Sequence, residues 1–153
     1  MADASPLIAL QQIDALPLLQ TLFGSVLVPP AVSREIAPSV PATPFIIERT
    51  LGQPLVPAVV LAGLDPGGET EAISLAVEIS ATNLIVDDRR GRRVASGLGI
   101  PIVGTLGLLQ AAKRRGLVPA VRPLIDAMLS HGFHVGPEWI QETLEAVGEV
   151  EEA

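Results

Sequence analysis

The chain has 153 residues, 48% of them apolar and 18% charged, which fits one folded domain and argues against intrinsic disorder. It has no cysteine and only two histidines, which excludes a disulfide framework, a thiolate nucleophile and a cysteine zinc site. The net charge of −7 comes from residues 123–153, because the 10 acids and the 10 Lys and Arg of residues 1–122 balance. The body of the protein can therefore still bind an anion.

Short apolar runs and helical stretches alternate along the chain. Residues 26–28, 84–86 and 100–103 predict strands that are buried on both faces. The proline-rich residues 38–58 predict a loop with one short helical piece near residues 45–51. Helices are predicted over residues 7–13, 16–23, 31–37, 69–80, 105–115, 119–130 and 137–147.

This order predicts an α/β fold, with a parallel sheet and helices on both of its faces. The chain forms a single domain over residues 1–153, in which residues 136–153 are an acidic C-terminal helix and tail. No apolar run reaches the length of a membrane span, and the opening Met1-Ala2-Asp3 does not resemble a signal peptide. We therefore expect a soluble, cytoplasmic protein that does not bind a membrane.

Ligand sites in parallel sheets lie at the carboxyl ends of the strands, so the polar residues that follow each strand are the candidates. Asp87 and Asp88 follow residues 84–86, and Thr105 follows residues 100–103. Asp3 stands before the first helix, and Glu35 lies in the helix after residues 26–28. Each acid also has a purely structural interpretation, since Asp87 or Asp88 could cap the next helix and Glu35 could be a solvated helix residue.

Glu69 is informative through its position around its helix. On a helix over residues 69–80, it falls at the edge of the apolar sector, whereas Glu71 falls well outside it. A carboxylate near the buried side must be paired, protonated or bound to a metal. The alternative is that Glu69 only complements the helix dipole as an acid of the first turn.

Taken together, several carboxylates at one strand edge indicate a site for a hard cation such as Mg²⁺ or Mn²⁺. Such ions activate water and stabilise the leaving oxygen in phosphodiester cleavage. Arginines fill four of the five positions 89–93, directly after Asp88, and suit a polyanion that approaches this site. Lys113 closes a later helix, where a cation also favours the helix dipole.

Several segments resemble one known family over almost the whole chain, and their combination is specific. The opening DASPLI of residues 3–8 resembles that of PIN-domain proteins. Further segments of the same branch are VPPAVSREI at 28–36, LDPGGETEAI at 64–73, LIVDDRRGRRVA at 84–95 and VGTLGLL at 103–109.

The resemblance implies a three-layer α/β/α nuclease with a central, mostly parallel sheet. Many members of the family are the ribonuclease toxins of VapC-type toxin–antitoxin pairs, so it also implies an RNA substrate, an antitoxin partner and Mg²⁺ or Mn²⁺. The catalytic and metal-binding residues that it implies are Asp3, Glu35, Glu69 and Asp87, with Asp88 as a further metal ligand. The residues expected at the substrate are Ser5, Arg89, Arg90, Arg92, Arg93, Thr105 and Lys113.

One departure concerns the first strand, because only Met1 and Ala2 precede Asp3 where the family has an apolar strand. Either the start is truncated or this strand is rudimentary, and a nearly missing strand favours a second hypothesis: an inactive PIN-fold module that binds a partner or nucleic acid. A nucleotide-binding domain is disfavoured, because GTLG at 104–107 lacks the spacing and the lysine of a P-loop. A homodimer is expected to cover the apolar helix at residues 16–23.

The C-terminal helix allows two interpretations. Trp139, Ile140, Leu144 and Val147 have helical spacing and are expected to dock on the body, with Glu142, Glu145 and Glu149 turned outward. Alternatively, the acids form a strip that binds a basic partner. His131 and His134 receive no role.

Overall fold

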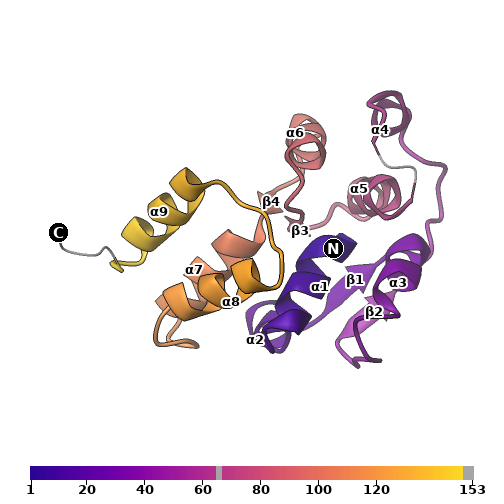
Figure 1. Ribbon diagram of the computed structural model, residues 1–153. Helices are drawn as coiled ribbons and strands as arrows, with labels where there is room; N and C mark the ends of the chain where they lie inside the picture. Colours follow the sequence, from indigo (N-terminus) through magenta and orange to yellow (C-terminus); the bar gives the residue numbers. More distant parts are fainter. Residues whose placement is uncertain (65–66, 150–153) are drawn as a thin grey trace.

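The computed structural model describes residues 1–64 and 67–149 (Figure 1). The tail acids Glu151 and Glu152, and Asp65 and Pro66 of the 64–73 motif, lie outside the described residues. Within them, no helix is both long enough and apolar enough to cross a membrane.

In the described part of the chain, four short strands form two parallel pairs. Strand β1 (Val26–Val28) pairs with β2 (Ile46–Glu48), with Val26 opposite Ile46. Strand β3 (Leu84–Ile85) pairs with β4 (Ile102–Val103), with Leu84 opposite Ile102. The β-branched and leucine side chains of β1 and β3 are almost all buried, as expected for parallel strands covered on both faces.

The first three residues join the two pairs. The Ala2 N–H donates to Leu27 O in β1 at 3.1 Å, and the Asp3 N–H donates to Ile85 O in β3 at 3.0 Å. The Ile85 N–H in turn donates to Met1 O at 2.9 Å, and Ala2 and Ile85 form a parallel bridge. The first strand is therefore rudimentary, as expected, yet it lies at the centre of the sheet and places Asp3 at its carboxyl end.

Strand β2 corrects one prediction. A helical piece was expected near residues 45–51, but Ile46–Glu48 is extended and pairs with β1. Two consecutive isoleucines favour the extended backbone, because branching at Cβ restricts their side chains in a helix. The Val26 N–H donates to Phe45 O at 2.8 Å, which holds the start of this pairing.

The helices largely follow the prediction, with two additions. Helix α4 lies where no helix was predicted, with its first two residues inside the predicted loop of residues 38–58, and it begins with Pro57, whose fixed φ suits a first helical position. Helix α6 begins after the cap residue Asp88, and its arginines are good helix formers. The predicted helix over 119–130 begins three residues later than expected. The helices are α1 (Ala4–Gln12), α2 (Leu18–Phe23), α3 (Pro30–Ile36), α4 (Pro57–Leu61), α5 (Gly68–Glu78), α6 (Arg89–Gly97), α7 (Thr105–Arg114), α8 (Arg122–Ser130) and α9 (Pro137–Ala146).

Helices lie on both sides of the strands, which confirms the predicted α/β fold. In Figure 1, α4, α5 and α6 lie above the strands and α3 lies to their right, whereas α7, α8 and α9 lie to the left. Helix α5 packs on β3 and α6 packs on β4. The largest fully buried side chains include Leu7, Leu10, Leu19, Ile73, Leu84 and Ile85.

The apolar helix at 16–23 is mostly covered by the chain itself. Leu16 and Leu19 are buried, and Leu18 and Leu22 are half-buried. Phe23, at the end of α2, is 38% exposed. The reason given for a homodimer therefore applies only to Phe23.

Candidate functional site

Two acids follow the adjacent central strands. Asp3 follows the bridging residue Ala2 and is buried, with 8% of its surface exposed. Its Oδ1 accepts a hydrogen bond from the Ala4 N–H at 2.8 Å, and it is the N-cap of α1. Asp87 lies just beyond β3, the strand to which the Asp3 backbone is bonded. The sequence predicted that these two acids lie at the same edge of the sheet, and the parallel pairing of Ala2 with Ile85 agrees with this.

Asp87 is held by the first residue of α7. Its Oδ1 accepts a hydrogen bond from the Thr105 N–H at 2.7 Å, and its Oδ2 accepts one from Thr105 Oγ1 at 2.5 Å. Thr105 is fully buried. These two donors at the start of α7 fix the orientation of the carboxylate. Thr105 thus acts on Asp87 here, whereas the sequence suggested a contact with substrate.

Glu69 lies in the first turn of α5 and faces the start of α6. Its Oε1 is fully buried, and a Cβ atom on Gly91 would overlap this oxygen and approach Glu69 Cδ to 3.0 Å. Only glycine at position 91 therefore leaves room for the carboxylate. This agrees with the predicted position of Glu69 at the edge of the buried face of its helix.

Glu35 and Glu71 connect α3 and α5. Glu35 Oε1 accepts a hydrogen bond from the Gly68 N–H at 2.9 Å, at the start of α5. Glu71 Oε1 accepts one from the Ala31 N–H at 3.3 Å, at the start of α3. Glu35 is therefore more than the solvated helix acid of the structural interpretation, because it caps a neighbouring helix.

Asp88 is the N-cap of α6, and its Oδ2 accepts a hydrogen bond from the Gly91 N–H at 2.9 Å. The capping interpretation is thus confirmed for Asp88, while Asp87 points to a different helix. Capping satisfies the first N–H groups of α6, which otherwise have no partner in the helix.

The arginines of α6 lie in different surroundings. Arg92 Nη1 donates to Val86 O at 3.1 Å, and a Cβ on Gly104 would lie 2.6 Å from the same nitrogen and 3.0 Å from Asp87 Oδ1. Arg90 Nη2 donates to Ala62 O at 2.8 Å. Arg89 and Arg93 are exposed. Arg92 is therefore the arginine that lies beside Asp87.

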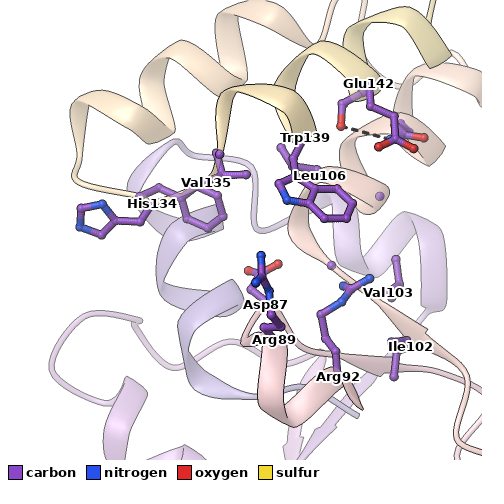
Figure 2. Close-up of a pocket in the computed structure, with 16 residues that line it drawn as sticks. Asp87, Arg89, Arg92, Ile102, Val103, Leu106, His134, Val135, Trp139 and Glu142 are labelled. Atoms are coloured by element: carbon purple, nitrogen blue, oxygen red, sulfur yellow. Dashed lines mark hydrogen bonds between the residues drawn. The ribbon is translucent and has the colours of Figure 1, made fainter. Parts of the chain in front are cut away.

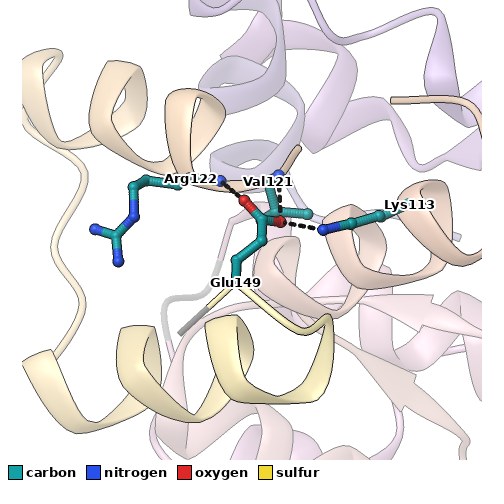
Figure 3. Close-up of polar contacts among 4 residues, drawn as sticks. All are labelled: Lys113, Val121, Arg122 and Glu149. Carbon is teal, nitrogen blue, oxygen red and sulfur yellow. Dashed lines mark hydrogen bonds and ion pairs between the residues drawn. The ribbon is translucent and has the colours of Figure 1, made fainter. Parts of the chain in front are cut away.

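Two residues that were predicted to bind substrate, Ser5 and Lys113, make no described contact with Asp87 or Arg92. Ser5 is exposed on α1. Lys113 lies eight residues after Thr105 on α7, about 12 Å further along the helix axis. Its Nζ forms an ion pair with Glu149 Oε2 at 2.9 Å (Figure 3).

Glu149 corrects the prediction that it faces outward. Besides Lys113, its carboxylate accepts hydrogen bonds from the Val121 and Arg122 N–H groups at 2.7 and 3.1 Å. Burial acts to raise the pKa of the Glu149 carboxyl, but these hydrogen bonds and the charge of Lys113 outweigh it, so that the pKa is lowered. The acid joins the end of the chain to α7 and α8.

A cavity of about 720 Å³ opens beside Asp87 (Figure 2). Arg89, Arg92 and Gly104 line it from α6 and the end of β4, and Trp139 lines it from α9. Trp139 was expected to dock on the body, but it is 50% exposed. The helical spacing of α9 could not reveal this, because spacing identifies a face of a helix and not what covers each residue on it.

The donors suit a hard cation by type, since all are carboxylate oxygens. The buried Oε1 of Glu69 fits this role, because a carboxylate oxygen out of water gains from a nearby positive charge. Within residues 1–64 and 67–149, however, no three Asp, Glu or His side chains lie close enough together to hold a metal ion. The side chains of Glu35, Asp87 and Asp88 instead bind N–H groups at helix starts.

A family model described as a PIN domain matches residues 1–149. Comparison with curated proteins gave no match, and comparison with solved structures gave none either.

Proposed function

Because the chain belongs to the PIN-domain family, whose members are in general nucleases, we propose that it is a metal-dependent endoribonuclease of the cytoplasm. In this proposal it hydrolyses phosphodiester bonds of RNA and is the toxin of a type II toxin–antitoxin pair. One observation carries the proposal most directly. Asp3 and Asp87 follow neighbouring positions at the centre of the sheet, with the arginines of α6 directly beyond Asp87.

Each residue has a distinct task in this proposal. Asp3, Glu35, Glu69 and Asp87 would hold the cation, with Asp88 as a further candidate. Thr105 keeps Asp87 in one orientation through two hydrogen bonds. Arg89, Arg90, Arg92 and Arg93 would attract the RNA backbone, and Arg92 lies beside Asp87, where a phosphate must arrive.

When bound, Mg²⁺ or Mn²⁺ lowers the pKa of a water molecule and stabilises charge on the phosphate oxygens. Of the acids that now bind N–H groups, Glu35 and Asp88 would have to turn toward the cation for this. Glu35 is exposed, so little packing opposes such a change. Asp87 is held more firmly and would keep its orientation.

The test is a calorimetric titration with Mn²⁺, followed by an RNA cleavage assay. We expect the wild type to bind Mn²⁺ and cleave RNA, and the Glu69→Ala/Asp87→Ala variant to do neither. Asp126→Asn is the matched control, because Asp126 is exposed on α8 and should leave both results unchanged. Circular dichroism checks that each variant is folded. A wild type that binds no Mn²⁺ at millimolar concentration, or binds it without cleaving RNA, contradicts the proposal.

A second function is favoured by the capping contacts. An inactive PIN-fold module would use Glu35, Asp87 and Asp88 only to join helices, as the hydrogen bonds at Gly68, Thr105 and Gly91 already do. For this function, the double variant of the calorimetric test would lose stability but the wild type would show no Mn²⁺ binding. Calorimetry thus separates the two functions.

The partners are part of the proposal. We propose that an antitoxin restrains the nuclease and that the chain forms a homodimer, with Phe23 at the contact because it is 38% exposed. Light scattering of the purified chain measures its mass in solution. Phe23→Ser should lower the dimer fraction, and a monomeric wild type at all concentrations would contradict the dimer.

A further inference from the structure

The cavity beside Asp87 has one apolar wall and one charged wall. Trp139 and Leu106 face Asp87, Arg89 and Arg92 across it (Figure 2). Its volume of about 720 Å³ lies within the range of about 300–1,000 Å³ that is typical of small-ligand sites. A ligand that fills it must therefore carry both a flat or apolar part and a negative charge.

The apolar wall offers an aromatic ring in an unusual setting. Trp139 is 50% exposed, although the neighbouring residue Ile140 is half-buried and Leu144, on the same helix, is buried. Large aromatic side chains are normally among the most buried in a domain. An exposed tryptophan over a cavity is a suitable platform for stacking a nucleic-acid base.

The charged wall offers a cation that is available for a ligand. Arg89 is exposed, and among the described residues it makes no hydrogen bond or ion pair. Arg92 lies deeper and is anchored on Val86 O at 3.1 Å. Glu142 lines the cavity from the side of Trp139 and opposes an anion there. The anionic part of a ligand is therefore expected near the arginines, and its uncharged part near Trp139.

We infer that this cavity binds one nucleotide of single-stranded RNA, with its base stacked on Trp139 and its phosphate at Arg89 and Arg92. The inference rests on the proposed function and names a contact of the substrate beyond the reacting phosphate. A nucleotide has a flat, uncharged base and an anionic phosphate, which its sugar connects. Asp87 lines the same cavity, so a base held on Trp139 keeps the adjoining backbone next to the acids.

The chain permits a direct measurement, because Trp139 is its single tryptophan and it has no tyrosine. Intrinsic tryptophan fluorescence therefore reports on this cavity alone. The probe is a hexaribonucleotide of adenosine, titrated in EDTA so that no cleavage occurs. We expect quenching that saturates, and the same dissociation constant from the anisotropy of a fluorescein-labelled hexamer.

Variants assign the two walls. Trp139→Ala should weaken binding of the labelled hexamer on the order of tenfold, while Trp139→Phe should keep most of it, because the stacking face is retained. Arg89→Gln should weaken binding and lower the slope of log K against log salt by about 0.7, since one phosphate contact is lost. Leu129→Ala and Arg114→Gln are the controls, because both residues are exposed on other helices and neither lines the cavity.

The outcomes separate this inference from the proposed function. Hexamer binding without quenching, or with an unchanged dissociation constant in Trp139→Ala, overturns the nucleotide site even if the wild type cleaves RNA. Quenching by the hexamer in EDTA supports the site even if no cleavage is found with Mn²⁺. Quenching by a protein partner but not by the hexamer would assign the cavity to that partner and overturn the inference.

Discussion

Glu35 and Glu71 cap each other's helices. Glu35 on α3 binds the Gly68 N–H at the start of α5, and Glu71 on α5 binds the Ala31 N–H at the start of α3. The first N–H groups of a helix have no hydrogen-bond partner within that helix. Here each helix provides a carboxylate that accepts such a hydrogen bond from the other helix. Glu35 is also an expected metal ligand, so its structural role and its chemical role have to be separated by experiment.

Substitution by glutamine separates these roles. Glu35→Gln keeps a carbonyl oxygen for the Gly68 N–H, so we expect it to cost less than about 1 kcal/mol of stability, whereas Glu35→Ala should cost about 1–2 kcal/mol. Urea denaturation measures both values. If Glu35 also holds a cation, Glu35→Gln loses RNA cleavage while remaining stable. Glu71→Gln is the control and should keep cleavage. Equal RNA cleavage by the wild type, Glu35→Gln and Glu71→Gln would mean that Glu35 only caps a helix.

Gly91 leaves the space that the Glu69 carboxylate occupies. Gly91→Ala should displace this carboxylate and weaken Mn²⁺ binding as Glu69→Ala does. Gly97 lies on the same helix with no atom within 4 Å of a Cβ, so Gly97→Ala gives the gain in helix propensity alone. We expect Gly91→Ala to be less stable than Gly97→Ala by about 1–3 kcal/mol in urea denaturation. Equal stability and equal Mn²⁺ affinity of the two variants would contradict the prediction, because the Cβ added at position 91 would then fit beside the Glu69 carboxylate without displacing it.

The Thr105 hydroxyl orients Asp87 from a fully buried position. Thr105→Val removes this hydrogen bond with little change in shape, and leaves one carboxylate oxygen without this donor. We expect a loss of about 1–3 kcal/mol of stability. RNA cleavage should fall as well, through kcat rather than KM, because the orientation of an acid changes and not the binding of RNA. Thr82→Val, at an exposed site, should alter neither. A variant with normal kcat would limit Thr105 to stability.

The contacts of Glu149 make stability depend on pH. Its pKa in the folded protein is lowered from an ordinary value of 4.5, so its contribution is complete above that value and is lost as the pH falls through the folded pKa. We expect the free energy of unfolding to fall more steeply below pH 4.5 for the wild type than for Glu149→Gln. Asp126→Asn should keep the steep decline of the wild type. Parallel curves for wild type and Glu149→Gln would contradict the assignment.

Local patterns were sufficient for the elements that pack on one core. Val26-Leu27-Val28 and Leu84-Ile85 are apolar runs of strand length, and both form strands. The position of Glu69 around its helix followed from helical periodicity alone, because the face of α5 that packs on β3 is set by its apolar residues. Capping by Asp88 could also be predicted, since aspartate is a preferred N-cap residue.

Features that depend on long-range contacts were not predictable. Ile46–Glu48 becomes a strand because β1 is available beside it, whereas the sequence predicted a loop with a short helical piece there. Glu149 turns inward because two N–H groups at the start of α8 and Lys113 converge on it, from residues 27–36 positions away. Trp139 stays 50% exposed because nothing in the described part of the chain covers its side chain fully, which periodicity cannot reveal.

The rudimentary central strand has a consequence for amide hydrogen exchange. The two halves of the sheet meet through the backbone of residues 1–3, so one opening event exposes the amides of Ala2, Asp3 and Ile85 at once. These amides should exchange at a common rate under native conditions, faster than those inside either half. The same opening separates Asp3 from Asp87. The hydrogen-exchange protection of these three amides would therefore report the fraction of time that the two acids are adjacent.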